Sequence, residues 1–323
     1  MSQRFDNIPE VALAWHRAAR GAVLATVVET WGSAPRPVGS QLAIARDGEI
    51  AGSVSGGCVE GAVIVEAQDA LEDGKPRMLE FGVSDDQAFA VGLACGGRIR
   101  VMIESVGTVL PEPMLTDLVA ARAIRVPIAY VVNPVTQTRA LVGASRYPDR
   151  FTNDKSGFDG EDFIAIHNPP LKLIVVGAVH IAQPLLVMAR LAGYDPVLVD
   201  PRSAFGSQAR FPDQDINNDW PDEALTAIGL DARTAVVTLS HDPKIDDPAL
   251  TTALGSDVFY IGSLGSTRTH AKRVVRLTDA GFSIEQIDRI HAPVGLNIGS
   301  KSPAEIAISI MAQLTECLRK PQL

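Results

Sequence analysis

The chain has 323 residues, of which 46% are hydrophobic and 21% are charged, and its 29 basic and 38 acidic residues give a formal net charge of -9. This composition is typical of a globular α/β protein rather than a disordered or fibrous one, and the negative charge disfavours nucleic acids and anionic membranes as partners. The length favours two domains. Because the sequence has no long apolar run and no apolar signal-peptide core near Met1, we expect a cytoplasmic protein.

The first part of the chain, residues 1–143, predicts an α+β domain. Apolar residues recur at helical spacing over 8–20, an apolar β-rich strand follows over 22–30, and a proline- and glycine-rich loop comes next. Asp47-Gly48 then supplies the positive φ angles that a tight hairpin turn needs. The other elements expected here are a helix over 58–71, strands at 77–83 and 98–104, a helix near 114–123 and a strand over 126–132.

Residues 144–170 differ from both flanking regions because they are polar, acidic and interrupted by proline and glycine. Only a brief apolar stretch lies within them. We therefore interpret 144–170 as a connector between domains.

The remaining residues, 171–323, predict a Rossmann-like domain with a doubly wound parallel sheet. A strand over 171–177, a helix over 180–193 and a strand over 196–200 form the opening of a βαβ unit. Further apolar strands at 234–240 and 257–263 alternate with helical patterns. The last helix has a clear beginning, since Ser302, Pro303 and Glu305 form a capping-box pattern.

The turn that begins at Gly177 lies where a dinucleotide-binding fingerprint would lie. Asp200 follows at the end of the next strand, the position of a ribose-binding acid. Val179 replaces the second glycine of that fingerprint, and this makes ordinary NAD binding a weaker hypothesis. Two alternatives stay open: the turn binds a phosphate or pterin, or it binds nothing and His180 is a local hydrogen-bonding residue.

A second strand-to-helix junction runs from Gly262 to Ser266 and is followed by several cations, among them Arg268. Free amides at a helix start favour anions, and ligands of doubly wound sheets gather outside the carboxyl ends of the strands. The junction therefore indicates a phosphate site that faces the same crevice as the Gly177 turn. The alternative is that the basic residues form only a solvated helix face.

The three cysteines have no CxxC spacing, so neither a disulfide framework nor a structural zinc site is indicated. Cys58 follows two glycines at the start of a predicted helix, where a thiolate is stabilised, and Cys95 has a similar glycine setting close to Arg98. Each is a candidate nucleophile or soft ligand, or else a small buried side chain. Cys317, on the last helix, is interpreted as a filler of core or surface.

Several segments of the chain, read in order, resemble one known family. They are ATVVETWGSAPRPVGSQLAI and GEIAGSVSGGCVEGAV, then ACGGRIRVMIE, then LIVVGAVHIAQPL with VLVDPR, and finally YIGSLGSTRTHAKR and HAPVGLNIGSKSPAEIAISIMAQ. The sequence is similar to the XdhC/CoxI family, accessory proteins of xanthine dehydrogenase and related molybdenum hydroxylases. The resemblance covers nearly all of the chain except the connector and residues 203–232.

The resemblance implies a chaperone that is not itself an enzyme. It would bind the molybdenum cofactor, as molybdopterin or its dinucleotide form, hold it while a cysteine desulfurase supplies sulfur, and insert it into an apo molybdenum hydroxylase. It also implies a homodimer. The residues assigned to cofactor binding are Gly56, Gly57, Cys58, Glu60, Cys95, Gly96, Gly97, Gly177, His180, Asp200, Gly262, Ser263, Gly265, Ser266 and Arg268, with Cys58 and Cys95 also next to the metal.

Two other functions stay open. The first is an NAD(P)-dependent oxidoreductase that uses the C-terminal domain, against which Val179 counts. The second is a thiol enzyme built on Cys58, although the spacing selects no histidine as its base. His241-Asp242 is a possible pair in the crevice, with helix capping by Asp242 as the commoner role of such a residue.

Overall fold

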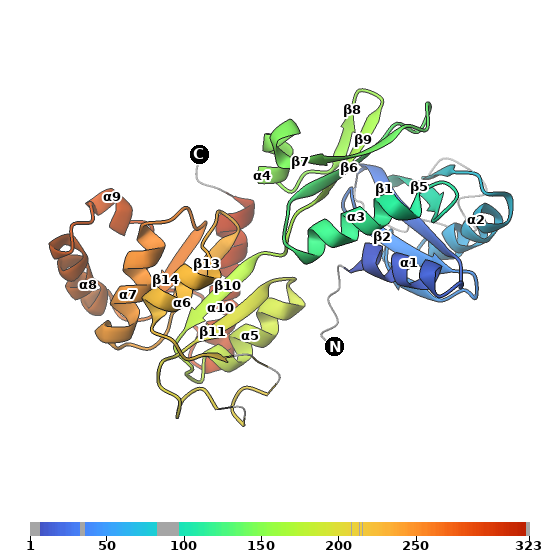
Figure 1. Cartoon of the computed structure of the whole chain (residues 1–323). Coiled ribbons are helices and arrows are strands. Elements are labelled where there is room, and N and C mark those ends of the chain that lie inside the picture. Colours follow the sequence, from blue (N-terminus) through green and yellow to red (C-terminus); the bar gives the residue numbers. More distant parts are fainter. Residues whose placement is uncertain are drawn as a thin grey trace. The chain divides into compact units, whose positions relative to one another are not determined.

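The computed structural model describes residues 7–32, 36–82, 97–207, 209–212, 214 and 216–320. Within it the chain divides into two compact units, Met1–Pro169 and Pro170–Leu323 (Figure 1). The first unit combines helices with antiparallel sheets and the second is built on one parallel sheet. This confirms the predicted fold class, an N-terminal α+β part followed by a Rossmann-like part.

The first unit contains a five-stranded antiparallel sheet with the order β3-β2-β1-β5-β4. Its elements are α1 (Ile8–Arg17), β1 (Ala22–Trp31), β2 (Gln41–Ala45), β3 (Ile50–Gly52), α2 (Glu60–Asp73), β4 (Arg77–Phe81), β5 (Arg98–Ser105) and α3 (Glu112–Ala123). The hairpin between β2 and β3 turns at Asp47-Gly48, as predicted.

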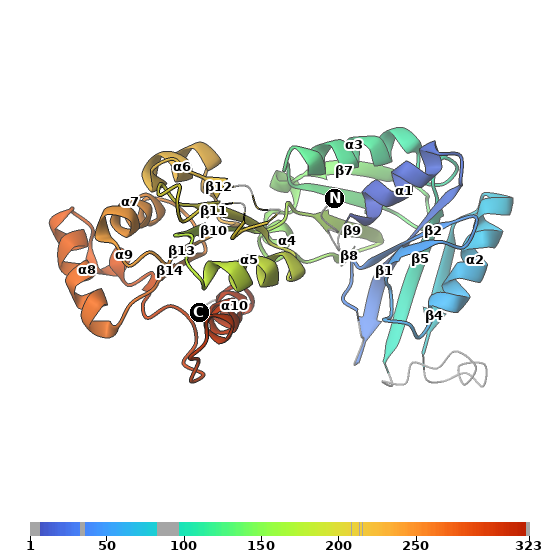
Figure 2. The same cartoon turned by 90° about the horizontal axis from the view of Figure 1, so that it is seen from below.

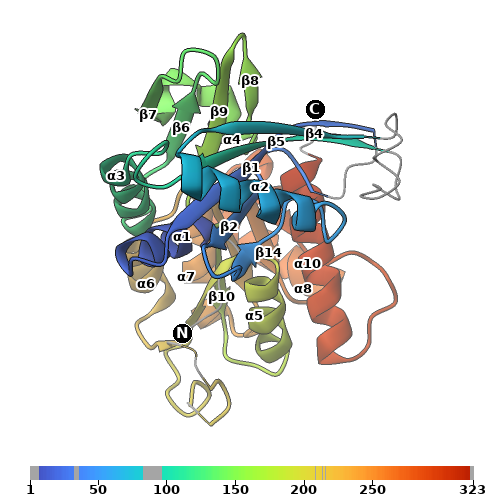
Figure 3. The same ribbon diagram turned by 90° about the vertical axis from the view of Figure 1, so that its right-hand side faces the viewer.

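Strand β1 lies in the middle of this sheet and is buried on both faces. Leu24 packs with α1 and α3 on one face, whereas Val23 and Ala25 pack with α2 on the other. Alternate side chains of a strand point to opposite faces, so an unbroken apolar run is what a doubly covered strand requires. Figure 3 shows α2 lying across the face of β1 and β5.

A second antiparallel sheet of the first unit has the order β7-β6-β9-β8. Its elements are β6 (Ile128–Val132), β7 (Arg139–Gly143), the 3₁₀ helix η1 (Ala144–Arg146), α4 (Pro148–Thr152), β8 (Gly157–Asp159) and β9 (Asp162–His167). The interpretation of 144–170 as a connector was therefore wrong. The brief apolar stretch is the strand β9, which pairs with β6 from Phe163 to His167, and Gly160 belongs to the turn between β8 and β9.

The second unit contains a six-stranded parallel sheet with the order β12-β11-β10-β13-β14-β15. Its strands are β10 (Lys172–Val176), β11 (Asp195–Val199), β12 (Ile216–Asn217), β13 (Thr234–Thr238), β14 (Tyr260–Ser263) and β15 (Ile290–His291). Counted within the unit this is the order 3-2-1-4-5-6 of the doubly wound dinucleotide-binding fold, which places the topological switch point between β10 and β13.

Helices cover both faces of the parallel sheet (Figure 2). They are α5 (Ala182–Leu191), α6 (Pro221–Ile228), α7 (Pro243–Leu254), α8 (Thr267–Asp279), α9 (Ile284–Ile287) and α10 (Pro303–Arg319). Side chains of α5 and α10 share one apolar cluster, and those of α6, α7, α8 and α9 share the other. No helix among the described residues is long and apolar enough to cross a membrane.

Two caps predicted from the sequence are present. The hydroxyl of Ser302 accepts a hydrogen bond from the backbone N–H of Glu305, and the Glu305 side chain accepts one in return from the N–H of Ser302. The Asp242 carboxylate accepts a hydrogen bond from the N–H of Lys244 at the start of α7. The helix-capping role of Asp242 is thus confirmed.

Candidate functional site

The loop between β3 and α2 holds Cys58 and is organised by one carboxylate. Glu60 accepts hydrogen bonds from the hydroxyls of Ser53 and Ser55 and from the backbone N–H groups of Val54, Ser55 and Gly57. Glu60 is only 9% exposed. Since a buried carboxylate needs such donors, Glu60 acts as a positioning residue that fixes the loop, and its oxygens are already in use.

The charge of Glu60 is stabilised by the same contacts. Burial acts to raise the pKa of Glu60, but the hydrogen bonds from Ser55 and Ser53 outweigh burial and bring the pKa to about 2. The carboxylate is therefore ionised at neutral pH. A negative charge this close to the loop's N–H groups satisfies them from within the protein.

One side of the loop is open. Gly57 has a φ of +112°, and a Cβ placed there would have no atom of the described residues within 4 Å. Gly52 differs, because a Cβ there would lie 2.3 Å from the carbonyl oxygen of Gln41. Gly52 is thus required by the fold, whereas Gly57 leaves room for another molecule beside the backbone.

Cys58 is partly buried and packs against the apolar cluster of β1, β2, β5 and α2. The helix α2 begins at Glu60, two residues later than the predicted start at Cys58. Among the described residues no histidine hydrogen bonds to Cys58, and no group of three or more His, Cys, Asp or Glu side chains could hold a metal ion. The contact of Cys317 with His291, at 3.6 Å, lies in the other unit.

Cys95 and Gly96 lie outside the described residues. Gly97 is buried directly before β5, and the side chain of Arg98 pairs with Glu80 at 2.9 Å and lies over the ring of Trp31. Arg98 therefore has partners of its own within the sheet.

The Gly177 turn joins β10 to α5 and is closed by internal hydrogen bonds. The N–H of Ala178 donates to the carboxylate of Asp200 at 2.7 Å, and the N–H of Val179 donates to the carbonyl of Gly177 at 2.9 Å. Val179 also packs against the core, while His180 is exposed. Two of the amides that would bind a phosphate are thus already used.

Asp200 is fully buried at the end of β11. Besides the Ala178 amide it binds Arg202, which donates from its backbone N–H at 2.9 Å and from its side-chain nitrogens at 2.9 and 2.8 Å. Burial acts to raise the pKa of Asp200, and the bonds from Arg202 and Ala178 lower it below the ordinary value. This carboxylate holds the turn closed, which does not favour the predicted ribose-binding role.

The Gly262 to Ser266 junction also has internal partners. Gly262 lies against Tyr260 and Val294, so a Cβ there would clash with both. The hydroxyl of Ser263 is buried and pairs with that of Thr238 at 2.6 Å. Ser266 caps α8 by accepting a hydrogen bond from Thr269 at 3.2 Å, and a Cβ at Gly265 would lie 3.1 Å from the Thr269 side chain. The four predicted residues, Gly262, Ser263, Gly265 and Ser266, thus shape the junction that leads into α8.

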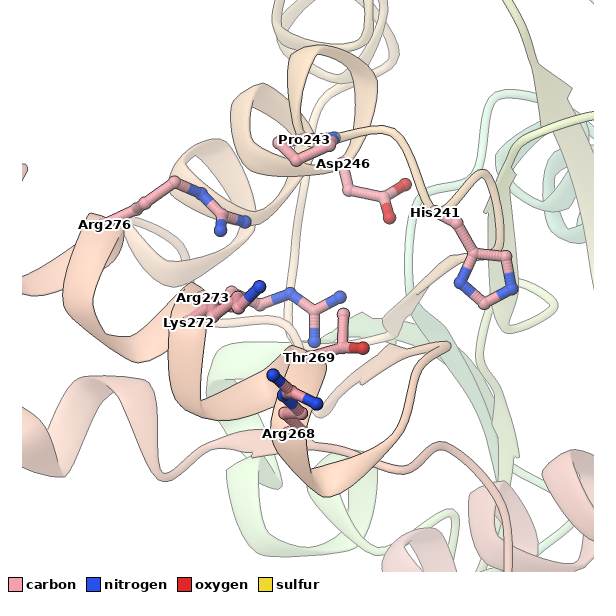
Figure 4. A pocket seen from close by; sticks show the side chains of 8 residues that line it. All are labelled: His241, Pro243, Asp246, Arg268, Thr269, Lys272, Arg273 and Arg276. Carbon is pink, nitrogen blue, oxygen red and sulfur yellow. The ribbon is translucent and has the colours of Figure 1, made fainter.

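A cavity of about 210 Å³ lies next to this junction, between α7 and α8 (Figure 4). It is lined by His241, Pro243, Asp246, Arg268, Thr269, Lys272, Arg273 and Arg276, and we call it the α7–α8 pocket. Of the residues that the sequence assigned to cofactor binding, Arg268 alone is among these eight. The pocket lies beyond the carboxyl ends of β13 and β14, where ligands of this fold bind. The Gly177 turn instead packs against the backbone of Ser240.

Sequence reasoning missed most of this pocket as a site. Lys272 and Arg273 belong to the cations that follow the Gly262 junction in the sequence, but nothing in the sequence pattern connects the carboxylate of Asp246 with them. One signal was present in the sequence. Arg273 lies four residues before Leu277, which places both on the same face of α8, and Leu277 is buried.

Both units are similar to known proteins. Residues 15–82 match the model of the XdhC and CoxI family, and residues 173–314 match that of the XdhC Rossmann domain. The molybdenum cofactor insertion chaperone PaoD of Escherichia coli is 30% identical over 297 residues, which cover 92% of this chain and 83% of that protein. The chain belongs to the XdhC and CoxI family.

Two other proteins of similar length are also similar to this chain. A protein of Bacillus subtilis described as a probable xanthine dehydrogenase subunit is 26% identical over 93% of this chain and 94% of its own length. A crystal structure described as a xanthine dehydrogenase from Bacillus halodurans has a TM-score of 0.79 and 25% identity, covering 97% of this chain and 96% of that one. The first matched range contains the Cys58 loop, and the XdhC Rossmann range contains the Gly177 turn and the α7–α8 pocket.

Proposed function

We propose that this chain binds the molybdenum cofactor as cargo and delivers it to an apo molybdenum hydroxylase of the xanthine dehydrogenase type. The observation that carries the proposal is the 30% identity to a molybdenum cofactor insertion chaperone over 92% of the chain, which includes both units. Family membership and the relative described as a probable xanthine dehydrogenase subunit support the same proposed function.

The Cys58 loop fits the soft end of such a cargo. A thiol sulfur is a ligand type that suits a soft metal or a sulfur-rich group. Glu60 keeps the loop in one conformation, and the open space at Gly57 leaves room beside the backbone. Cys58 with Gly56 and Gly57 would therefore receive the metal end of the cofactor, and Cys95 with Gly96 would be its second contact.

The rest of the proposal concerns partners. A cysteine desulfurase would supply sulfur while the cofactor is held, the chain would act as a homodimer, and the exchange would take place in the cytoplasm. In this role the chain supplies binding and protection rather than a catalytic group of its own.

The rival proposal is an NAD(P)-dependent oxidoreductase. Its support is the strand order 3-2-1-4-5-6 of the second unit. Against it stands the Gly177 turn, because the carboxylate of Asp200 is bound to Arg202 and Ala178 and the N–H of Val179 is bound to Gly177. A dinucleotide would have to displace these bonds.

The test is direct retention of the cargo. The purified full chain is incubated with isolated molybdenum cofactor, free cofactor is removed, and the pterin fluorescence of the protein fraction is measured after oxidation. We expect about one cofactor per chain, lost in Cys58→Ser and in Gly57→Ala.

Two matched variants serve as controls. Gly61→Ala adds the same methyl group in open space on α2, and Cys317→Ser removes a thiol of the other unit, so both are expected to retain the cofactor. Absence of retention by the unaltered chain, or equal retention by Cys58→Ser and Gly57→Ala, would contradict the proposal. Retention of NAD alone would favour the oxidoreductase.

A further inference from the structure

Arg273 is a buried cation with an incomplete set of partners. The residue is 2% exposed, and its side chain lines the α7–α8 pocket. One guanidinium nitrogen, Nη2, donates to the carbonyl of Leu264 at 3.1 Å, whereas Nε and Nη1 are buried and have no hydrogen-bond partner among the described residues. Buried N–H groups are nearly always satisfied, and a charged one left unpaired costs more than a neutral one. The position of Arg273 thus indicates that a partner is supplied from outside the chain.

The other charges of the pocket leave it positive. Arg268, Lys272 and Arg276 line it together with Arg273, and Asp246 is the carboxylate among the lining residues. Arg276 is paired with Asp247 at 2.5 and 2.9 Å. The two carboxylates, Asp246 and Asp247, carry two negative charges, and the four cations that line the pocket carry four positive ones. An excess of positive charge therefore faces this space. Figure 4 shows the cations on consecutive turns of α8 and the Asp246 carboxylate across from them on α7.

Asp246 does not accept a hydrogen bond from the free nitrogens of Arg273. Its Oδ1 accepts a hydrogen bond from the hydroxyl of Ser240 at 2.6 Å, and the residue is 2% exposed. Burial raises the pKa of Asp246 and lowers that of Arg273, while the attraction between the two acts against both changes. The pair attract each other without sharing a hydrogen bond, and the Nε and Nη1 nitrogens of Arg273 remain without a hydrogen-bond partner among the described residues.

The start of α8 adds to the attraction for an anion. The helix has 13 residues, and the pocket includes Arg268 and Thr269 of its first turn. The positive end of the helix dipole therefore acts on the same space as the cations. The cavity of about 210 Å³ is smaller than the roughly 300–1,000 Å³ that holds a whole drug-sized ligand, so it suits one charged end of a larger molecule.

We infer that the α7–α8 pocket binds a phosphate or diphosphate group, with the free N–H groups of Arg273 as its buried donors and Lys272 and Arg268 at its mouth. A planar guanidinium pairs with phosphate oxygens in this way. The inference rests on the proposed function for the identity of the ligand, since it assigns the phosphate end of the cargo to this pocket. The binding of the anion itself is independent of the cargo.

The experiment is a calorimetric titration of the full chain with inorganic phosphate, inorganic diphosphate and a nucleoside diphosphate. We expect saturable binding of at least one of them. Arg273→Met, in which an apolar chain of similar length replaces the cation, should weaken this binding at least tenfold, and the exposed Lys272→Gln about threefold. Asp246→Asn removes the opposing negative charge and should tighten binding about threefold. Lys320→Gln makes the same charge change as Lys272→Gln outside the pocket and should have no effect.

The ranking of the three anions identifies the source of the group. Tightest binding of phosphate would indicate a monoester end, and tightest binding of diphosphate or nucleoside diphosphate a dinucleotide form of the cofactor. The inference is overturned if none of the three binds, if Arg273→Met and Lys272→Gln bind as the unaltered chain does, or if Asp246→Asn weakens binding. A chain that retains the cofactor through Cys58 but binds none of these anions would refute this inference and leave the proposed function standing.

Discussion

The Cys58 loop and the α7–α8 pocket are both places where the sequence puts glycines near a helix start, but they treat charge in opposite ways. In the loop, Glu60 accepts hydrogen bonds from three backbone N–H groups and two hydroxyls. In the pocket, two buried nitrogens of Arg273 have no hydrogen-bond partner in the part of the chain that the structure describes. The loop carries its own anion, whereas the pocket lacks one.

The Gly177 turn belongs with the Cys58 loop in this comparison. Its Ala178 amide is bound by the carboxylate of Asp200, so it too contains a built-in anion. A glycine-rich turn collects backbone N–H groups, but a nearby Asp or Glu decides whether an external anion can use them. The external phosphate is thus expected at the pocket, and the two turns are expected to serve as rigid supports.

The largest expected effect comes from removing the anion of the Gly177 turn. Asp200→Ala leaves the Ala178 amide unpaired and Arg202 without its carboxylate, so we expect a loss of about 2–3 kcal/mol in the free energy of unfolding. Urea denaturation measures this. Asp222→Ala, in the exposed first turn of α6, is the control and should cost less than 1 kcal/mol. Equal losses in the two variants would mean that Asp200 does not support the turn.

The next effect concerns the anion of the Cys58 loop. Glu60→Gln keeps the size of the side chain but replaces one acceptor oxygen by a donor, which leaves loop N–H groups unpaired at a cost of about 2 kcal/mol. Glu66→Gln on the same helix breaks a partly exposed pair with Arg77 and should cost less than 1 kcal/mol. The comparison would fail if Glu60→Gln unfolded at the same urea concentration as the unaltered chain.

The pH dependence follows from the same carboxylate. The pKa of Glu60 is about 2 in the folded chain, below its ordinary value of 4.5. The ionised carboxylate therefore contributes fully to the free energy of unfolding above pH 4.5, and this contribution is lost as the pH falls towards 2. We therefore expect the unfolding midpoint of the unaltered chain to fall more steeply across this window than that of Glu60→Gln. Parallel curves for the two proteins would show that the carboxylate gains nothing from the loop.

The smallest stability effect is expected at Gly57. The Cβ of alanine there meets no atom of the described residues within 4 Å, so Gly57→Ala carries only the strain of its positive φ, about 1 kcal/mol. Gly61→Ala, at a helical φ in α2, should be neutral or slightly stabilising. Thermal unfolding measures both. A loss of several kcal/mol in Gly57→Ala would mean that the space beside the loop is needed by the fold rather than open to a ligand.

Much of the fold could be predicted from local signals. The apolar run over 22–30, the Asp47-Gly48 turn and the Ser302 cap each depend on a few neighbouring residues, and all three predictions were confirmed. The second antiparallel sheet was missed because β9 is a short apolar segment inside a polar stretch, and its pairing with β6 is a contact between distant parts of the chain. Short-range sequence patterns do not show which distant strands pair with each other.

The candidate site shows the same limit. The sequence located the glycine turns at Gly56, Gly177 and Gly265, because glycine at a positive φ has a local cause. It did not show that Glu60 and Asp200 fill two of them, or that Asp246 of α7 would face Arg273 of α8. These contacts depend on how elements pack, which is a property of the folded unit.

The most direct test follows the N–H groups themselves during a titration with diphosphate. In a ¹⁵N-labelled full chain, the side-chain Nε–H signal of Arg273 should shift and saturate, while the backbone signals of Ala178 and Gly57 stay in place because Asp200 and Glu60 already bind them. The opposite result, with Ala178 or Gly57 shifting and Arg273 unchanged, would contradict the assignment of the external anion to the α7–α8 pocket.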